Sequence, residues 1–192
     1  MHLLFKHTKI NSKKEEKGLS LIESAMVLAL AATVTAGVMF YYQSASDSNK
    51  TQSAISEVMS ATSAINGLYI GQSSYSGVSA SVLKNSSAIP ENYKSGEKIM
   101  NPFGGELKVG TSTNNNFGYY LALEKLPKSA CISLSTLNLG TSAAAYGVFS
   151  DSSSLEGTQF NGTNVKTQSI SPSDAAGLCQ DGSSNVVAYF MK

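Results

Sequence analysis

The sequence predicts an α+β fold, in which one long N-terminal helix packs on an antiparallel sheet accompanied by short helices. An apolar run of 24 residues begins at Leu19, and an amphipathic helical pattern follows it. Short segments rich in β-branched and aromatic residues, separated by turn residues, occupy the second half of the chain. The 192 residues leave room for one ordinary domain in addition to the apolar segment.

The first 18 residues form a short basic segment. Five lysines stand against two glutamates there, which gives the segment a charge of +3, whereas the whole chain carries only +1. Positive charge ahead of an apolar segment holds that end in the cytoplasm, so we expect the rest of the chain to face outward. The overall charge gives no reason to expect nucleic acid as a partner.

The apolar run extends from Leu19 to Tyr42 and contains one charged residue, Glu23. At about 1.5 Å of rise per residue, such a helix spans the hydrocarbon core of a bilayer, which is ~30 Å thick. A carboxylate in lipid is costly without a cationic partner, whereas the helix dipole favours an acid in the first turn. Glu23 is therefore a candidate either for helix capping or for pairing with a positive charge.

A cleaved secretory signal is a rival interpretation of the same run. The small residues Ser44, Ala45 and Ser46 could form its cleavage site. The run is, however, longer than the ~7–15 apolar residues of an ordinary signal, which favours a helix that is kept.

The helix is expected to continue beyond Tyr42 as an amphipathic half. Apolar residues recur there at spacings of three, four and seven, in a stripe of Ile55, Val58, Met59, Ile65, Leu68 and Tyr69 with Thr62 in the gap. The pattern predicts one helix from about Ser20 to about Tyr69, whose second half packs its stripe on a globular core.

The remaining elements are expected to be short. Strands are predicted at Glu106–Val109, Phe117–Leu123, Ala144–Phe149 and Val186–Met191, and the last is expected in the middle of the sheet. Helices are predicted at Val78–Leu83, at Lys128–Leu139 and from Ser171, where Ser-Pro and an acid three residues later form a helix start. Ser150–Gly162 is interpreted as a loop.

Composition excludes several chemistries. Both histidines, His2 and His7, precede Gly18, so a chain beginning at Leu19 has no histidine-based triad or histidine metal site. The chain has no arginine, which excludes an arginine clamp on phosphate. The cysteines Cys131 and Cys179 fall in the part expected outside the cytoplasm, where an even count favours one disulfide. Two unrelated thiols are the alternative, and metal binding is disfavoured because no CxxC spacing is present.

The start of the chain resembles a known family. Gly18 followed by an apolar residue, with Glu23 five residues on and an unbroken apolar helix behind it, is similar to the prepilin signature of type IV pilins. The 18-residue leader, Leu19 after the glycine and the large Cys131–Cys179 loop resemble the type IVb branch. The resemblance extends over most of the chain from Lys17 onward and implies the type IV pilin fold.

The resemblance implies a role for each of these residues. A prepilin peptidase would cut between Gly18 and Leu19, and the new α-amino group of Leu19 would be methylated. Glu23 would pair with that amine on a neighbouring subunit, and Cys131 and Cys179 would close the C-terminal loop. The chain would then consist of a leader (1–18), a transmembrane and fibre-core helix (19–42) and a globular pilin domain (43–192). Phe40 stands where many type IVa pilins have a kinking proline.

The function implied is that of a structural subunit, not an enzyme, with no cofactor, metal or catalytic residue. It would be the major pilin of a type IVb pilus, stored in the inner membrane and then polymerised outside the cell by the assembly machinery. Adhesion, bundling and autoaggregation would involve neighbouring pili and the host cell surface. A minor pilin, a secretion pseudopilin, a helix-anchored enzyme and a secreted binding domain are the alternatives.

Overall fold

The structure is a computed structural model, and it describes residues 20–113, 116–160 and 162–192. Gly18 and Leu19, the expected processing residues, lie outside the described part. The chain divides into two compact units, residues 1–42 and 43–192.

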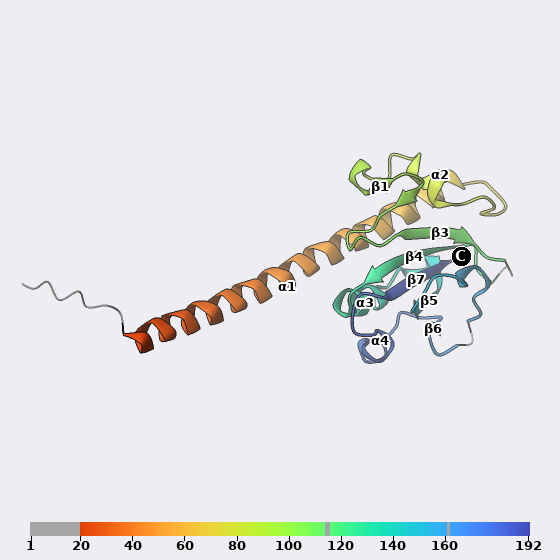
Figure 1. Ribbon diagram of the computed structural model, residues 1–192. Coiled ribbons are helices and arrows are strands. Elements are labelled where there is room, and N and C mark those ends of the chain that lie inside the picture. Colours follow the sequence, from red (N-terminus) through yellow and green to blue (C-terminus); the bar gives the residue numbers. More distant parts are fainter. Residues whose placement is uncertain (1–19, 114–115, 161) are drawn as a thin grey trace, which may run out of the picture. The chain divides into compact units, whose positions relative to one another are not determined.

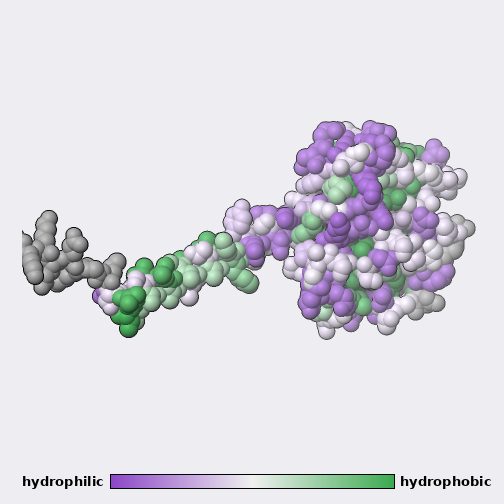
Figure 2. All heavy atoms as spheres, in the orientation of Figure 1, coloured by the Kyte–Doolittle hydropathy of each residue, from purple (hydrophilic) through white to green (hydrophobic). Residues whose placement is uncertain are grey.

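A single helix, α1 (Leu21–Leu68), accounts for the first described element of the chain. Its bounds agree with the predicted Ser20–Tyr69, and Gly37 does not interrupt it. In the first unit its large apolar side chains are exposed, and green spheres predominate along this part of the helix in Figure 2. By length and composition this helix is able to cross a membrane.

The second half of α1 packs into the globular unit through small residues. Ala54, Val58, Ala61 and Ile65 are fully buried, and their spacing of four, three and four places them on one helical face. The predicted stripe is wrong for Met59 and Leu68, which are 58% and 51% exposed. The two alanines define the buried face instead, because they permit a close approach of α1 to the core.

The globular unit is built on a five-stranded sheet in which every neighbouring pair is antiparallel. The strands are β3 (Leu107–Thr111), β4 (Tyr119–Leu126), β5 (Ala143–Phe149), β6 (Val165–Lys166) and β7 (Asn185–Met191), in the spatial order β3-β4-β7-β5-β6. The C-terminal strand β7 thus lies in the middle, as predicted (Figure 1). A separate two-stranded hairpin, β1 (Lys94–Ser95) and β2 (Lys98–Ile99), was not predicted, because its strands are only two residues long.

Both faces of the sheet are buried. Along β7, Tyr189 belongs to the core cluster that includes α1, whereas Phe190 belongs to a second cluster on the other face. The segment expected to be a loop, Ser150–Gly162, supplies part of that second cluster. It contains a short 3-10 helix, η3 (Leu155–Gly157), whose Leu155 is only 1% exposed. The segment is therefore a cover for the sheet as well as a connection.

The three predicted short helices lie close to their predicted positions, as α2 (Ala80–Lys84), α3 (Lys128–Ser135) and α4 (Pro172–Leu178). Two 3-10 helices, η1 (Glu91–Tyr93) and η2 (Gly140–Ser142), were not predicted. At the start of α4, Ser171 Oγ accepts a hydrogen bond from the Asp174 N–H (3.2 Å). Helix α3 ends four residues before the predicted Leu139, because the Leu139 N–H donates to the hydroxyl of Tyr146 on β5 (2.9 Å).

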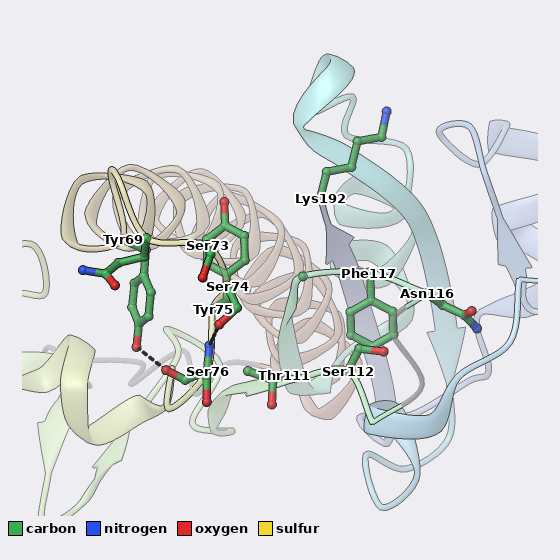
Figure 3. Close-up of a pocket in the computed structure, with 12 residues that line it drawn as sticks. Tyr69, Ser73, Ser74, Tyr75, Ser76, Thr111, Ser112, Asn116, Phe117 and Lys192 are labelled. Carbon is green, nitrogen blue, oxygen red and sulfur yellow. Dashed lines mark hydrogen bonds between the residues drawn. The ribbon is translucent and has the colours of Figure 1, made fainter.

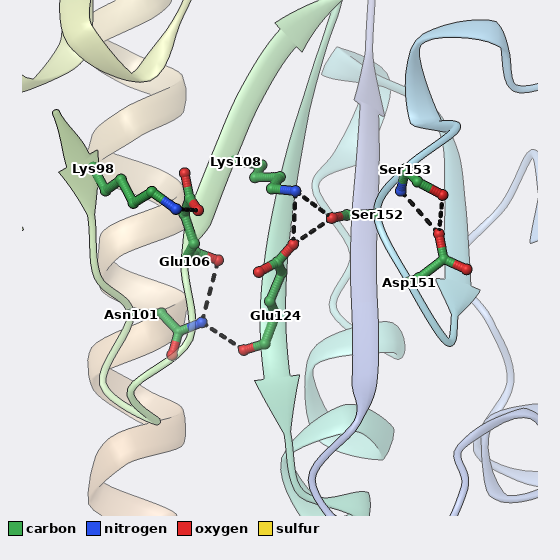
Figure 4. A network of polar contacts seen from close by, with 8 residues as sticks. All are labelled: Lys98, Asn101, Glu106, Lys108, Glu124, Asp151, Ser152 and Ser153. Atoms are coloured by element: carbon green, nitrogen blue, oxygen red, sulfur yellow. Dashed lines mark hydrogen bonds and ion pairs between the residues drawn. The ribbon is translucent and has the colours of Figure 1, made fainter.

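A buried asparagine fixes the turn that leads into β3 (Figure 4). The Asn101 Oδ1 accepts from the Phe103 and Gly105 N–H groups (2.9 and 3.2 Å), and its Nδ2 donates to the carbonyl oxygen of Glu124 on β4 (2.8 Å). Gly105 lies against the same strand. A Cβ at Gly105 would overlap the Glu124 carbonyl oxygen and lie 2.9 Å from Asn101 Nδ2.

Gly105→Ala is therefore expected to destabilise the globular unit by at least about 2 kcal/mol, since backbone atoms must move to admit the methyl group. The matched control is Gly177→Ala in α4, where an added Cβ meets no atom within 4 Å. There the change should be neutral or stabilising by up to about 1 kcal/mol. Urea unfolding of both variants measures the difference, and equal midpoints would contradict the expected overlap.

Candidate functional site

The N-terminal end of α1 carries the charged residue that the sequence singled out. The Ser20 N–H donates to Glu23 Oε2 (3.0 Å), and Ser20 Oγ accepts from the Ile22 N–H (3.4 Å). The contact from Glu23 back to the Ser20 N–H is that of a capping box, whereas Ser20 Oγ caps the N–H of the second helical residue, Ile22, in place of the third. Within one chain, then, Glu23 does have the capping contact that was one of its two expected roles.

The environment of Glu23 leaves room for a second partner. The side chain is exposed, and among the described residues Ser20 is its one hydrogen-bond partner. The surrounding helix surface is apolar, with Leu21 90% exposed and Met26 63% exposed. When lipid or other helices cover such a surface, the carboxylate loses its hydration. One hydrogen bond from a neutral donor does not offset that desolvation cost, so a nearby cation is strongly favoured.

A disulfide closes the C-terminal part of the globular unit. Cys131 lies in α3 and Cys179 directly follows α4, with their Cα atoms 6.0 Å apart. Both residues are buried, and the chain has no free cysteine. The bond joins the two short helices beside the core, and the chain that it encloses includes β5 and β6.

Replacing both cysteines by serine should destabilise the globular unit by about 4 kcal/mol, by the loop-entropy estimate for a closed loop of this length. Urea unfolding of the oxidised wild type, the reduced wild type and the serine variant measures the loss of unfolding free energy. The reduced wild type lacks the bond but keeps both cysteine side chains, so it separates the effect of the bond from that of the serine substitutions. An unchanged midpoint after reduction would show that the loop is held by packing alone.

A polar network joins the sheet to the covering segment 150–162 (Figure 4). Lys108 Nζ lies 3.0 Å from Glu124 Oε1 and donates to Ser152 Oγ (2.6 Å), and the Ser152 hydroxyl donates to Glu124. Burial raises the pKa of Glu124, but the hydrogen bonds from Ser152 and Lys108 outweigh it and hold the pKa below its usual value. The network is thus strongest when Glu124 is ionised.

One buried acid was missed by the sequence analysis. Glu57 on α1 is only 4% exposed, and neither of its carboxyl oxygens has a hydrogen-bond partner among the described residues. Burial raises its pKa to about 8. Its spacing was the available signal, because Glu57 lies three residues after Ala54 and four before Ala61, which places it beside the buried face.

A broad hollow near the end of α1 is lined mostly by polar side chains (Figure 3). It has a volume of about 700 Å³, and the ring of Tyr75 in its wall packs on Tyr69 and Tyr119 (centroids 5.6 and 4.8 Å apart). None of its twelve lining residues is an acid or a histidine.

Comparison with known proteins agrees with this architecture. The family model described as Bundlin matches residues 43–188. A "Major structural subunit of bundle-forming pilus" from Escherichia coli O111:H- is 65% identical over 192 residues, which cover 96% of this chain and 99% of the relative. The subunit of the same description from Escherichia coli O127:H6 (strain E2348/69 / EPEC) is also 65% identical, over 193 residues with the same coverage.

Among solved structures, a type IV b pilin from Salmonella typhi aligns with a TM-score of 0.55, covering 76% of this chain and 99% of that chain. At 17% identity the likeness concerns the fold, and it places the chain among proteins with the type IV pilin fold. The family match and the 65% identities are more specific. The chain belongs to the bundlin family.

Proposed function

We propose that the chain is the precursor of the major structural subunit of a bundle-forming pilus. The relatives that carry this description match nearly the whole chain at 65% identity. The structural observation that carries the proposal is the exposed apolar surface of α1 between Leu21 and Tyr42. Such a surface is not stable in water, and either lipid or a bundle of identical helices covers it.

The same helix serves two stages in this proposal. Before assembly it spans the inner membrane, with the globular unit outside the cytoplasm. During assembly it moves from lipid into the centre of a fibre. Both environments are apolar, so the hydrophobic effect does not distinguish them, and packing and polar contacts between helices must supply the specificity.

Processing would provide the cation that Glu23 lacks. Cleavage by a prepilin peptidase between Gly18 and Leu19 leaves a free α-amino group one residue before Ser20, which is then methylated by transfer from a methyl donor. In the fibre, the amine of one subunit pairs with Glu23 of its neighbour. The capping contact to the Ser20 N–H at 3.0 Å supports this arrangement, because it holds the carboxylate at the same end of the helix as the amine.

The remaining roles follow from a structural subunit and include no catalysis. The polar surface segments within Lys84–Lys98 and Ser150–Gly177 would contact neighbouring pili and the host cell surface, and so support bundling and adhesion. Buried residues of these segments, such as Leu155 in the second core cluster, cannot take part in such contacts.

Material sheared from the surface of producing cells tests the proposal. Electron microscopy should show fibres composed mainly of this chain, and intact mass with N-terminal sequencing should give a methylated Leu19. A start near Ser46 would instead indicate a secreted domain, and an intact Met1 a plain membrane anchor. Fibres that contain this chain only in traces would indicate a minor pilin.

A further inference from the structure

The globular unit exposes three large apolar side chains among its described residues. They are Met59, Leu68 and Ile70, which are 58%, 51% and 82% exposed. All three lie on the second half of α1 or in the turn that follows it. Large apolar side chains gathered on one element of an otherwise polar surface are typical of an interaction site.

Met59 forms one wall of a groove between α1 and the segment that follows α3. The groove has a volume of about 430 Å³, and Leu137, Leu139 and Met191 contribute its other apolar walls. Clefts of this size accommodate small organic groups, so the groove has room for one or two aliphatic side chains.

Leu68 points away from that groove. It lies nine residues after Met59, which is about two and a half turns at 3.6 residues per turn, so the two side chains leave α1 on opposite sides. Ile70 lies in the turn two residues further on, before Gly71 with its φ of +81°. One domain therefore presents an apolar groove on one side of α1 and an apolar projection that consists of Leu68 on the opposite side and the exposed Ile70 just beyond the helix end.

The two surfaces also match in charge. None of the groove residues is charged, and residues 66–76 around the projection contain no charged side chain. Elsewhere the same domain carries five ion pairs between described residues. A neutral projection is thus suited to a neutral groove and not to the charged remainder of the surface.

We propose that Leu68 and Ile70 of one subunit insert into the groove between Met59 and Leu139 of the next identical subunit in the fibre. Because projection and groove lie on opposite sides of one helix, they cannot both contact the same neighbour through a two-fold interface. They form a head-to-tail contact, which repeats without closing and so extends a filament. The inference rests on the proposed pilus function.

Cysteine cross-linking of assembled fibres tests the contact. Since the native cysteines are both in the disulfide, new ones can be placed at exposed sites as Ile70→Cys and Ser63→Cys, the latter beside the groove. With a short bismaleimide, the double variant should give a ladder of dimers, trimers and higher multimers. Each single variant should stay monomeric, and an equal mixture of the two single variants should stop at dimers.

Several results would overturn the inference. The first is the absence of a ladder from normal fibres of both double variants, Ile70→Cys with Ser63→Cys and Leu68→Cys with Met59→Cys. It would show that the projection does not occupy the groove. Dimers from Ile70→Cys alone would indicate a two-fold contact. Wild-type cells without any fibres would be a failure of the proposed function instead. Ile70→Cys with Glu156→Cys, an exposed position outside the groove, is the control for random collision.

Discussion

Replacing Glu57 with glutamine should remove most of the dependence of the globular unit's stability on pH between 5 and 8. The carboxyl is buried and has no hydrogen-bond partner in the described part of the chain, and burial raises its pKa from 4.5 to about 8. In this window the folded chain holds a proton on Glu57 that the unfolded chain releases. Stability therefore falls as pH rises, by about 1.4 kcal/mol per unit.

The neutral amide of the Glu57→Gln variant does not titrate. Its free energy of unfolding relative to wild type should increase by about 4 kcal/mol from pH 5 to pH 8. The test compares how the free energy of unfolding changes with pH in the two proteins, and not its absolute value. The unpaired amide N–H groups of the glutamine also lower stability, but they do so equally at every pH. Glu57→Met, which keeps the length of the side chain and removes both oxygens, should show the same flat profile.

Urea unfolding of the full chain in detergent, followed by tyrosine circular dichroism, measures these profiles. Glu156→Gln, at an exposed acid, is the control and should follow the wild-type curve. Parallel curves for wild type and Glu57→Gln would show that Glu57 is ionised or hydrated in the folded chain. Near and below pH 4, loss of the ionised Glu124 network should lower stability in all variants, because the pKa of Glu124 is depressed.

Glu23→Gln should abolish fibres while the globular unit stays folded. Glutamine can still accept the hydrogen bond from the Ser20 N–H, which Glu23 Oε2 accepts at 3.0 Å, but it has no charge for the Leu19 amine. Glu23→Ala removes both the cap and the charge, and it should fail in the same way. Because Glu23 lies outside the globular unit, the unfolding curve of that unit should not change.

Counting fibres on cells that express each variant, together with the amount of processed subunit in the membrane, separates the capping contact of Glu23 from its proposed charge pairing. Ser20→Ala, which removes the serine hydroxyl from the cap and keeps the charge, is the matched control and should retain fibres. Normal fibres from Glu23→Gln would show that capping is sufficient and that charge pairing is not needed.

The sequence predicted those elements whose physical cause is local. The apolar run and the absence of proline were sufficient for α1. Val186–Met191 was predicted as a strand in the middle of the sheet, and it is the central strand β7. Turn residues and the Ser-Pro start located α4.

The features that the sequence did not predict depend on contacts between distant segments of the chain. Met59 and Leu68 fit a helical stripe, but the small side chains of Ala54 and Ala61 decide which face α1 buries. Leu155 is one apolar residue in a polar stretch, and only its position over the sheet makes it part of a core. The contact between Ser20 and Glu23 was foreseeable as capping, whereas the proposed pairing of Glu23 across subunits depends on the fibre.

A reconstruction of the assembled fibre at side-chain resolution tests the central claim most directly. Our account predicts the methylated Leu19 amine of one subunit within about 4 Å of the Glu23 carboxylate of its neighbour, the distance of an ion pair. A fibre in which Glu23 remains bonded only to Ser20 of its own chain, with the Leu19 amine elsewhere, would contradict it.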